Sequence, residues 1–289
     1  MKYLAKIIAS DQEGLQMISA CSSGAKVKIA DIKYLASNKV FLLSVERIKV
    51  ENENEDKKVN SILRFDFVDK VRSKNIDQSN QEEVLELISS LNNDCKIDAI
   101  LLQLPLPEHL NEREILEKIS FVKDVDGLTA INQGRLFINT PTHIPCTPQG
   151  VMHLLDQTSI SLSGKVACVI GRSTLVGSPI ARLLLQANAS VIQIHSKTVE
   201  PKKLCLLADV VVVACGKACF VDDTWIKKGA IVIDVGIHRT EDGLCGDVNF
   251  EKVSHKARCI TPVPGGVGPM TIACLLKNTL HAYEIQINS

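Results

Sequence analysis

The stretch Lys165-Val-Ala-Cys-Val-Ile170-Gly171-Arg-Ser173-Thr-Leu-Val-Gly177-Ser-Pro179 decides the fold. Its first six residues form a short apolar run between Gly164 and Gly171, which predicts a buried β-strand. A turn containing glycine and serine follows. Residues 178–186 then have helical character, with Pro179 tolerated in the first turn. A strand, a turn and a helix in this order are typical of α/β domains in which a helix N-terminus holds a phosphate.

Three more apolar runs in the second half predict strands at residues 190–194, 208–214 and 230–235. Short β-rich runs that alternate with helical segments are typical of a parallel sheet covered on both faces. We therefore expect an α/β fold with a C-terminal Rossmann-type, doubly wound sheet. Three prolines cluster between Thr140 and Pro148, which places a domain junction there.

The first half of the chain is also predicted to be α/β. We expect a strand at residues 25–30 and a helix at 34–48. Apolar residues at helical spacing predict another helix over 81–91. Residues 98–103 form a short apolar run, which predicts a buried strand stopped by the prolines that follow it. The charged stretch 50–78 is expected to be a surface loop with one short strand, and a partner-binding insertion is the alternative.

Composition and charge exclude several classes of protein. The chain has 289 residues, which suggests about two domains. Hydrophobic residues make up 45% of it, enough for a sizeable core rather than disorder. The 33 basic and 33 acidic side chains balance, which argues against bulk binding of nucleic acid. No apolar run approaches the roughly 20 residues of a membrane span, and no signal or transit pattern is present, so we expect a cytoplasmic protein.

The ten cysteines lack the spacing of a metal site. The sequence contains no Cys-x-x-Cys pair and no cysteine–histidine cluster, so no metal is expected. Most of the cysteines lie in apolar stretches, as Cys168 and Cys215 do. They are therefore expected to be small buried hydrophobic residues in a reducing compartment.

The turn after residue 170 also bears on the choice of cofactor. It departs from Gly-x-Gly-x-x-Gly, because Ser173 holds the place of the middle glycine; a plain structural turn is the alternative. The next strand ends in His195-Ser196-Lys197-Thr198, without the acid that usually binds the ribose of NAD. A hydroxyl and a cation there, with Arg172 in the turn, suit a 2′-phosphate. NADP is therefore favoured over NAD.

Three further segments are too unusual to be generic. They are Leu102-Gln103-Leu-Pro-Leu-Pro107, Lys123-Asp-Val-Asp126-Gly127 and Ile260-Thr-Pro-Val-Pro264-Gly-Gly-Val-Gly268-Pro-Met-Thr271. With the turn at 171–179 and the strand at 231–237, they closely resemble the bifunctional methylenetetrahydrofolate dehydrogenase/methenyltetrahydrofolate cyclohydrolase (FolD) family. The resemblance runs from about residue 83 to 282 and is weak before about residue 80.

The resemblance implies two domains around a cleft and a homodimer. Residues 1–142 and 270–289 would form the folate-binding domain, an α/β domain completed by the C-terminal helix, and residues 143–269 the NADP-binding Rossmann domain. The implied substrates are small molecules, NADP and a tetrahydrofolate derivative. Hydride would pass from 5,10-methylenetetrahydrofolate to NADP, and water would then open the methenyl product to 10-formyltetrahydrofolate.

The resemblance also implies roles on the folate side. Asp126 matches the carboxylate that accepts two hydrogen bonds from the pterin; a turn-capping aspartate is the alternative. Gln103 matches the residue that hydrogen-bonds the catalytic lysine; a glutamine bonded to backbone is the alternative. Tyr34 matches the ring that stacks on folate; an ordinary half-buried aromatic is the alternative. The remaining matches form a wall against the ligand, with a purely structural loop as the alternative: Pro264, Gly265, Gly266 and Gly268.

On the cofactor side, the residues that match the family's NADP contacts are Gly171, Arg172, Ser173, Ser196 and Ile237. The glycine allows close approach of backbone. Ile237 would act through its backbone near the nicotinamide. The hydride step itself needs little acid or base help, so positioning two ligands face to face is its main requirement.

One family motif is altered. The family has Tyr-x-x-x-Lys on one helical face, and here Asn38 holds the lysine position while Lys39 is one residue late. One residue is about 100° of helix rotation, so Lys39 is a doubtful replacement for the missing amine. We therefore hypothesise that the dehydrogenase survives and that the cyclohydrolase is weak or absent. A rival hypothesis within the same family is that the helix is shifted, so that Lys39 supplies the catalytic amine.

Two other classes of function compete with this hypothesis. A degenerate relative that binds folate or nucleotide without catalysis is motivated by the altered region between Tyr34 and Lys39. Another Rossmann dehydrogenase with a different substrate is the third class, but the segments at 102–107 and 123–127 argue against it.

Overall fold

The computed structural model describes residues 26–35, 40–48, 58–66, 74, 76–241 and 243–288. The chain divides into two compact units, Met1–Ile76 and Asp77–Ser289. The predicted junction at 140–148 lies within the second unit.

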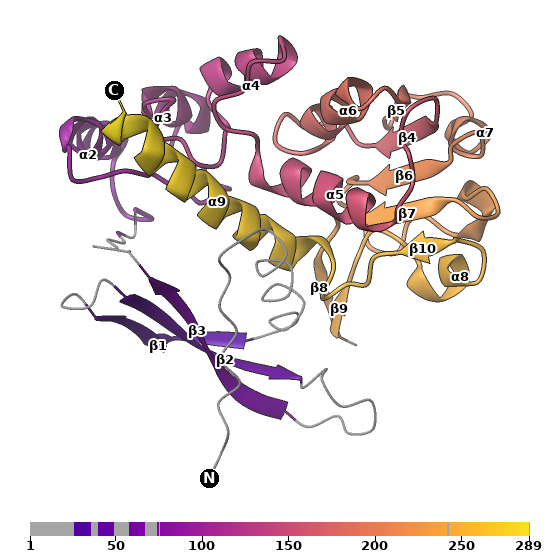
Figure 1. Ribbon diagram of the computed structural model, residues 1–289, viewed down its shortest axis with the longest axis horizontal. Coiled ribbons are helices and arrows are strands. Elements are labelled where there is room, and N and C mark those ends of the chain that lie inside the picture. The colour runs from indigo at the N-terminus through magenta and orange to yellow at the C-terminus, as the bar shows by residue number, and fades with distance from the viewer. Residues whose placement is uncertain are drawn as a thin grey trace. The chain divides into compact units, whose positions relative to one another are not determined.

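The first unit contains a three-stranded antiparallel sheet. Its strands are β1 (Lys26–Leu35), β2 (Val40–Ile48) and β3 (Lys58–Asp66), in that order across the sheet (Figure 1). The predicted strand at 25–30 is thus confirmed within β1, and the single strand expected in the charged stretch is β3.

The predicted helix at 34–48 is wrong. Its ends lie in β1 and β2, which pair in antiparallel register with Tyr34 opposite Phe41. Residues 40–45 read Val-Phe-Leu-Leu-Ser-Val, and β-branched and aromatic residues favour a pleated surface. Because β2 pairs along its whole length with β3 as well, pairing between strands distant in sequence decides the structure of this segment.

The second unit is built on a five-stranded parallel sheet, which confirms the predicted fold class (Figure 1). The strands are β4 (Val166–Ile170), β5 (Ser190–Ile194), β6 (Val210–Val213), β7 (Ile231–Asp234) and β10 (Cys259–Ile260). Their order is β10-β7-β6-β4-β5. The chain therefore moves from β4 to one side and then returns to the other, as in doubly wound folds.

Helices surround this sheet and extend the second unit. They are α2 (Gln81–Asn93), α3 (Glu112–Lys118), α4 (Ala130–Phe137), α5 (Cys146–Gln157), α6 (Gly177–Gln186), α7 (Pro201–Cys205), α8 (Phe250–Ser254) and α9 (Val267–Ile287), with a 3-10 turn at Asp223–Trp225. A hairpin of β8 (His238–Thr240) and β9 (Gly243–Cys245) follows β7. The predicted helix at 81–91 is confirmed as α2. None of the helices in the described parts of the chain is long and apolar enough to cross a membrane.

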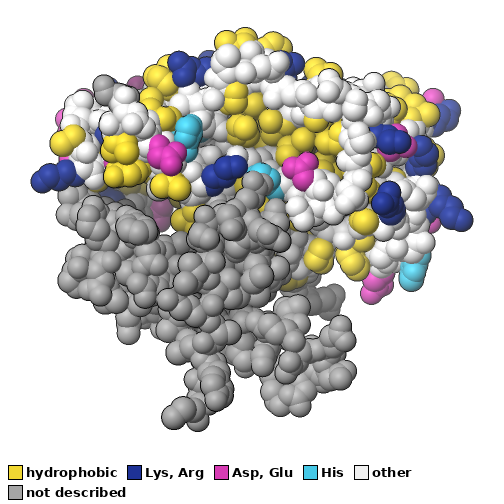
Figure 2. Space-filling view, in the orientation of Figure 1, with side chains coloured by type: hydrophobic (Ala, Val, Ile, Leu, Met, Phe, Trp, Pro, Cys, Tyr) yellow, Lys and Arg dark blue, Asp and Glu magenta, His cyan; other side chains and the backbone are white. Residues whose placement is uncertain are grey.

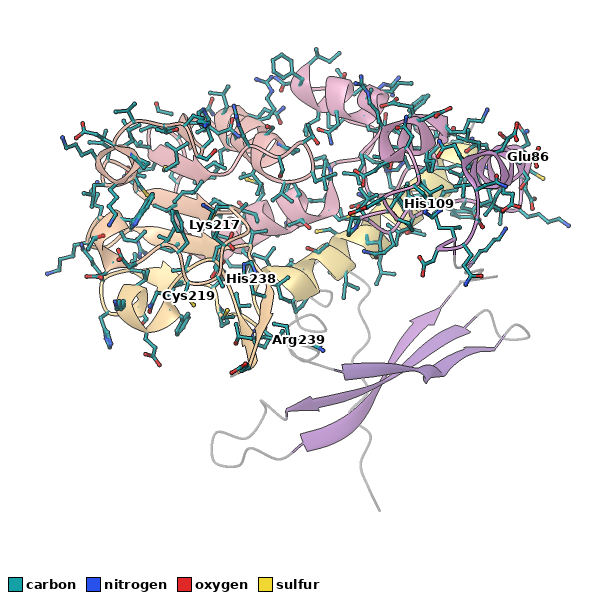
Figure 3. All side chains as sticks on the ribbon, turned by 180° about the vertical axis from the view of Figure 1, so that it is seen from behind. Glu86, His109, Lys217, Cys219, His238 and Arg239 are labelled. Carbon is teal, nitrogen blue, oxygen red and sulfur yellow. The ribbon has the colours of Figure 1, made fainter. Side chains whose placement is uncertain are left out.

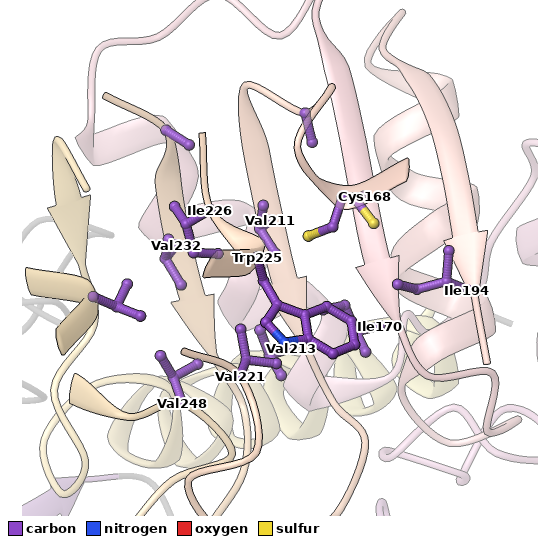
Figure 4. Packing of buried hydrophobic residues seen from close by; sticks show 14 residues of the cluster. Cys168, Ile170, Ile194, Val211, Val213, Val221, Trp225, Ile226, Val232 and Val248 are labelled. Carbon is purple, nitrogen blue, oxygen red and sulfur yellow. The ribbon is translucent and has the colours of Figure 1, made fainter. Parts of the chain in front are cut away.

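Both faces of the sheet are buried, because alternate side chains of each strand enter two different cores. On one face, residues such as Val211 and Val213 pack with Trp225 (Figure 4). On the other face, Val210 and Val212 pack with residues of α5 and α6 such as Leu155. All four valines of β6 are completely buried, which explains why this strand is uniformly apolar.

The predicted buried strand at 98–103 is wrong in its extent. Only Ile100 pairs, through an isolated parallel bridge to Asp124, and the next residue, Leu101, is 48% exposed. An apolar run becomes a buried strand only where neighbouring strands accept its hydrogen bonds. Among the described residues of the second unit, this segment has only the bridge at Ile100.

Helix α9 crosses the second unit from α5 towards α2 and α3 (Figure 1). Near its middle, the Asn278 side chain donates to the carbonyls of Val125 and Ile144, both at 2.8 Å. Near its end, the Gln286 side chain donates to the carbonyl of Asp98 at 2.8 Å. The C-terminal helix thus holds together the segments that carry the candidate folate residues.

Candidate functional site

The turn between β4 and α6 requires glycine at both ends. Gly171 has φ of +130°, and a Cβ there would lie 2.1 Å from the carbonyl oxygen of Ala214 in the segment after β6. A Cβ on Gly177 would lie 2.6 Å from the carbonyl oxygen of Gly171. Any side chain at either position would force the turn away from the sheet. The turn is therefore held tightly against the carboxyl ends of β4 and β6.

Arg172 and Ser173 form the exposed part of this turn. The Ser173 hydroxyl oxygen accepts hydrogen bonds from the amides of Val176 and Gly177, at 3.2 and 3.3 Å, and so caps the start of α6. The Arg172 guanidinium makes no hydrogen bond or ion pair with any residue in the described ranges. A helix N-terminus beside an unpaired guanidinium suits an anion. These residues therefore fit the phosphates of a dinucleotide.

The turn after β5 presents two more polar side chains. The His195 amide donates to the Thr198 hydroxyl at 2.9 Å, and the Thr198 amide donates to the His195 carbonyl at 2.9 Å. This closed turn leaves Ser196 and Lys197 exposed at its tip. No acidic residue stands in this turn, so its chemistry suits an added phosphate better than a ribose hydroxyl.

All five predicted cofactor residues lie at one edge of the parallel sheet. Gly171, Arg172 and Ser173 follow β4, Ser196 follows β5, and Ile237, 65% exposed, follows β7. The strand order reverses between β4 and β6, and ligands of open α/β sheets bind at such a switch point outside the carboxyl ends. The structure thus brings together the residues that were predicted separately from the sequence.

The sequence reasoning missed Asp247, a completely buried carboxylate behind this edge. The amides of Cys215, Gly216 and Lys217 donate to it at 2.7, 2.9 and 2.9 Å. His238 Nε2 lies 2.7 Å from the same carboxylate. Asp247 therefore fixes the loop after β6. The available signal was an acid directly after Gly246, close to the expected cofactor residue Ile237 in sequence.

A second buried acid, Asp234 at the end of β7, supports the first. Its carboxylate accepts from the amides of Gly236, Asp247 and Val248 at 2.9 to 3.0 Å. A Cβ on Gly246 would lie 1.9 Å from this carboxylate, so only glycine fits there. Burial raises the pKa of Asp234 to about 6, against the effect of these three hydrogen bonds.

The folate-side motif at 123–127 contains three charged side chains, and two of them have structural partners. The buried Lys123 ammonium donates to the carbonyls of Leu91, Asn92 and Asp94 at 2.8 to 3.1 Å, which caps the end of α2. These bonds remove Lys123 from consideration as a group that contacts a ligand.

Asp124 is the second charged side chain of the motif with structural partners. It accepts from the Thr129 amide at 2.9 Å and from the Asn132 side chain at 2.8 Å. These bonds fix the start of α4. Asp126 is therefore the charged group of the motif that stays available.

Asp126 lies half-buried beside the first residue of α5. The Cys146 amide donates to its carboxylate at 3.4 Å. The pKa of Asp126 is raised, chiefly by burial, while the contacts with Cys146 oppose the rise. A partly desolvated carboxylate at a helix N-terminus, with one long hydrogen bond, has capacity to accept further donors.

Gln103 and Asp126 follow two segments that pair at Ile100 and Asp124. The Gln103 side chain, however, has a local hydrogen-bond partner. The Ile100 amide donates to the Lys123 carbonyl at 2.7 Å, and the parallel bridge at Ile100 sends Gln103 and Asp126 in the same direction. The exposed Gln103 amide donates to the Leu104 carbonyl at 3.0 Å. Gln103 therefore lies on the same side as Asp126. Its hydrogen bond to the Leu104 carbonyl fits the alternative of a glutamine bonded to backbone.

The loop before α9 has two kinds of glycine. A Cβ on Gly266 would lie 2.7 Å from the Pro262 carbonyl oxygen, so this glycine serves the packing of the loop itself. Gly268, in the first turn of α9, faces open space, with no atom within 4 Å of a Cβ. Gly265, after Pro264, has φ of +113°. Within the wall predicted at 264–268, Gly266 is packed against the loop itself and Gly268 leaves open space at the α9 end.

Helices α5 and α9 bring this loop to Asp126. The hydroxyls of Thr147 in α5 and Thr271 in α9 are 3.0 Å apart. A Cβ on Gly150 would lie 3.0 Å from the Cβ of Met270, so the two helices approach closely near their N-termini. Asp126 contacts the first residue of α5, and the loop at 264–268 leads into α9. The two predicted folate elements therefore share one neighbourhood.

Tyr34, Asn38 and Lys39, the residues of the altered family motif, belong to the first unit. Tyr34 lies in β1 of the first unit, and Asn38 and Lys39 lie outside the described residues.

Some large apolar side chains of the second unit are exposed to solvent. Figure 2 shows hydrophobic side chains gathered in the middle of one face. Large exposed apolar residues include Phe137 and Ile138 at the end of α4 and Leu185 in α6, which are 68%, 66% and 51% exposed. Surfaces of this kind are typical of binding sites for ligands or partner subunits.

Two protein families match different parts of the chain. Residues 145–287 match the family described as tetrahydrofolate dehydrogenase/cyclohydrolase, NAD(P)-binding domain. Residues 5–100 match a different family, described as a protein of unknown function (DUF2948). The amino-terminal part therefore has a relationship of its own.

Individual relatives and solved structures agree with the first match. The bifunctional protein FolD of Thermodesulfovibrio yellowstonii is 49% identical over 211 residues, which are 73% of this chain and 74% of that protein. The FolD of Campylobacter hominis is 54% identical over 205 residues, 71% and 72% of the two chains.

Among solved structures, the bifunctional FolD of Campylobacter jejuni has a TM-score of 0.70 and 47% identity, covering 72% of this chain and 75% of that one. The Trypanosoma brucei enzyme, solved with NADP and an inhibitor, has a TM-score of 0.70 and 38% identity, covering 74% and 75%. These likenesses cover more than two thirds of the chain, far more than the motifs alone. The chain belongs to the bifunctional methylenetetrahydrofolate dehydrogenase/cyclohydrolase (FolD) family.

Proposed function

We propose that the chain oxidises 5,10-methylenetetrahydrofolate to 5,10-methenyltetrahydrofolate with NADP as the hydride acceptor. The observation that carries this proposal is Asp126, a half-buried carboxylate left available when the other charged groups of its motif are bound internally. Its support is the family membership and the fit of the sheet edge to a phosphorylated dinucleotide.

On the folate side, Asp126 accepts two parallel hydrogen bonds, from the amino group and the adjacent ring N–H of the pterin. Gln103 lies next to the one-carbon unit, after its amide turns away from the Leu104 carbonyl. Pro264, Gly265, Gly266 and Gly268 form the wall against the ring, with closest approach at Gly268, where the structure leaves open space.

On the cofactor side, Arg172, Ser173 and Ser196 bind phosphate groups, and the backbone at Ile237 contacts the nicotinamide end. Gly171 allows the turn to remain tight against the sheet. NADP supplies the electron-deficient ring that receives the hydride. The chain's own residues contribute orientation, since holding the two rings face to face lowers the entropic part of the barrier.

We also propose that the cyclohydrolase step is weak or absent. This is supported by Asn38, which stands where the family motif has lysine, and by Tyr34, which lies in strand β1 rather than in the expected helix. Tyr34 and Lys39 have no role in this proposal, because Tyr34 lies in a strand, whereas the family motif places its tyrosine on a helix.

We propose further that the protein is a cytoplasmic homodimer. The exposed apolar residues Phe137, Ile138 and Leu185 are consistent with a partner subunit. Gel filtration with light scattering on the full chain tests the oligomeric state.

The two activities separate in a pair of assays on the purified full chain. We expect NADPH to form, by its absorbance, when methylenetetrahydrofolate and NADP are added. We expect added methenyltetrahydrofolate to disappear no faster than in buffer. A fast, enzyme-dependent loss of the methenyl compound that Lys39→Met abolishes would contradict the second expectation. Calorimetric binding of both ligands without NADPH formation would instead favour the non-catalytic alternative.

Arg172→Ala is expected to reduce the preference for NADP over NAD by about tenfold or more, because a charge-assisted hydrogen bond to a phosphate contributes about 1.5–3 kcal/mol. The measurement is the ratio of kcat/KM for the two dinucleotides. Arg135→Ala is the matched control, since Arg135 lies on α4 and donates to Thr142, away from the sheet edge. An unchanged ratio in the Arg172 variant would place the 2′-phosphate elsewhere.

A further inference from the structure

Two cysteines from different segments meet beside the loop that Asp247 holds. Cys219 follows this loop and is exposed, and Cys245 ends β9 and is partly exposed. The Cys219 amide donates to the carbonyl of Gly246 at 2.9 Å, so the two cysteines are adjacent across the pair of segments. Figure 3 shows Cys219 near His238, which lies opposite Cys245 in the β8–β9 hairpin.

The backbone segments that carry the two thiols are held together by hydrogen bonds. Val221 pairs with Val248 in a parallel bridge, and the Val221 amide donates to the Asp247 carbonyl at 3.0 Å. The pKa of Cys245 is raised, chiefly by desolvation and further by the neighbouring Cys219 thiol. Since both segments are fixed, the sulfur atoms stay neighbours.

The other cysteines provide useful contrasts. Cys168 and Cys205 are also neighbours, but both are completely buried in the core shown in Figure 4. Cys259 is exposed, and no neighbouring cysteine is found for it in the part of the chain that the structure describes. The expectation of buried cysteines therefore holds for the core pair and is wrong for Cys95, Cys219 and Cys259, which are exposed. A reagent in solution can reach Cys219.

We infer that Cys219 and Cys245 form a reversible disulfide by exchange with a low-molecular-weight disulfide. One thiolate attacks the reagent and releases one reagent thiol, and the second thiolate attacks the mixed disulfide and releases the other. The two cysteine sulfurs lose two protons and two electrons, and the reagent disulfide is reduced to two thiols. The new bond joins the loop after β6 to the β8–β9 hairpin.

This bond is expected to alter the cofactor edge. The sulfurs must close from contact to about 2.05 Å, which draws the 215–219 loop towards the hairpin. The loop lies at the carboxyl end of β6, where the dinucleotide binds if the proposed function is correct. We therefore expect oxidation to raise the Kd for NADP several-fold, a part of the inference that rests on the proposed function.

The bond itself is tested without any activity. The full chain is incubated with oxidised glutathione, free thiols are alkylated, and the protein is digested with trypsin without reduction. We expect the peptide 218–227 joined to the peptide 240–252, at a mass two hydrogens below their sum, and its disappearance after dithiothreitol. Recovery of both peptides alkylated, or each carrying glutathione, would overturn the inference.

Matched variants complete the experiment. Cys219→Ser and Cys245→Ser should each abolish the joined peptide, whereas Cys259→Ser should retain it, and the peptides of Cys168 and Cys205 should stay unlinked in all. Calorimetry then compares NADP binding by reduced and oxidised protein, with Cys245→Ser expected to be insensitive to oxidation. A joined peptide with an unchanged Kd would overturn the effect on the cofactor edge. Failure of the reduced protein to bind NADP would refute the proposed function and leave the peptide result standing.

Discussion

Asp126→Ala is expected to lower kcat/KM for methylenetetrahydrofolate by about 100-fold or more, while the Kd for NADP changes little. The carboxylate would accept two hydrogen bonds from the pterin, and each bond to a charged group contributes about 1.5–3 kcal/mol. A partly buried site makes their loss costly, because the ligand's donors would stay unpaired. The measurement is steady-state NADPH formation over a range of folate concentrations, with NADP binding followed separately by calorimetry.

A graded variant and a control variant test this prediction further. Asp126→Asn keeps one acceptor and loses the charge, so a reduction of about tenfold is expected. Glu108→Ala removes an exposed carboxylate from the loop after Pro107 and should leave kcat/KM unchanged. If Asp126→Ala and Glu108→Ala were equally active, the pterin would have to be held by another group.

The pH dependence follows from the same carboxylate. Burial raises the pKa of Asp126 above its ordinary value of 3.8, and only the ionised form accepts two donors. The KM for folate is therefore expected to rise as the pH falls, beginning at a higher pH than for an ordinary aspartate, and to be restored as the pH rises. In Asp126→Asn this part of the pH profile should vanish.

The sheet could be predicted from the sequence because its strands are buried on both faces. Residues 210–213 are four consecutive valines, and such a run between polar segments has few alternatives to a central parallel strand. Predicted and observed bounds agree for β5, at 190–194. The glycines at the ends of the turn, Gly171 and Gly177, could also be singled out, because a strand–turn–helix unit requires close approach there.

The failures occurred where pairing partners decide the structure. Residues 34–48 were expected to form a helix, but β2 is paired on both sides. Residues 98–103 have the composition of a buried strand, but only Ile100 finds a partner in the described part of the second unit. In both segments the local pattern was compatible with two structures, and contacts with residues distant in sequence selected one.

Some residues of the candidate site could be predicted from the sequence, and others could not. Asp126 was identifiable because its motif is short and continuous in sequence. The roles of Lys123 and Asp124 as caps of α2 and α4 were not, since their partners lie on other segments. Asp247 was missed for the same reason, because its amide partners at 215–217 are about thirty residues earlier in the chain.

Asp247→Ala is expected to destabilise the second unit by about 3–5 kcal/mol and to weaken NADP binding by about tenfold or more. The variant leaves three amides without their acceptor, and each unsatisfied buried group costs about 1–3 kcal/mol. The carboxylate is completely buried, so water cannot replace it without opening the loop. The measurements are urea unfolding of the full chain and calorimetry with NADP.

Graded variants separate the network from a general packing defect. His238→Ala removes only the partly exposed partner at 2.7 Å, and is expected to cost less than about 1 kcal/mol because the three amide bonds remain. Asp247→Asn keeps one oxygen but turns an amide donor towards N–H groups, so its cost should fall between the other two. The two carboxylate oxygens share four donors, with Cys215 and Gly216 on one and Lys217 and His238 on the other. Equal stability of Asp247→Ala and His238→Ala would mean that the loop after β6 is held by its own turn rather than by this acid.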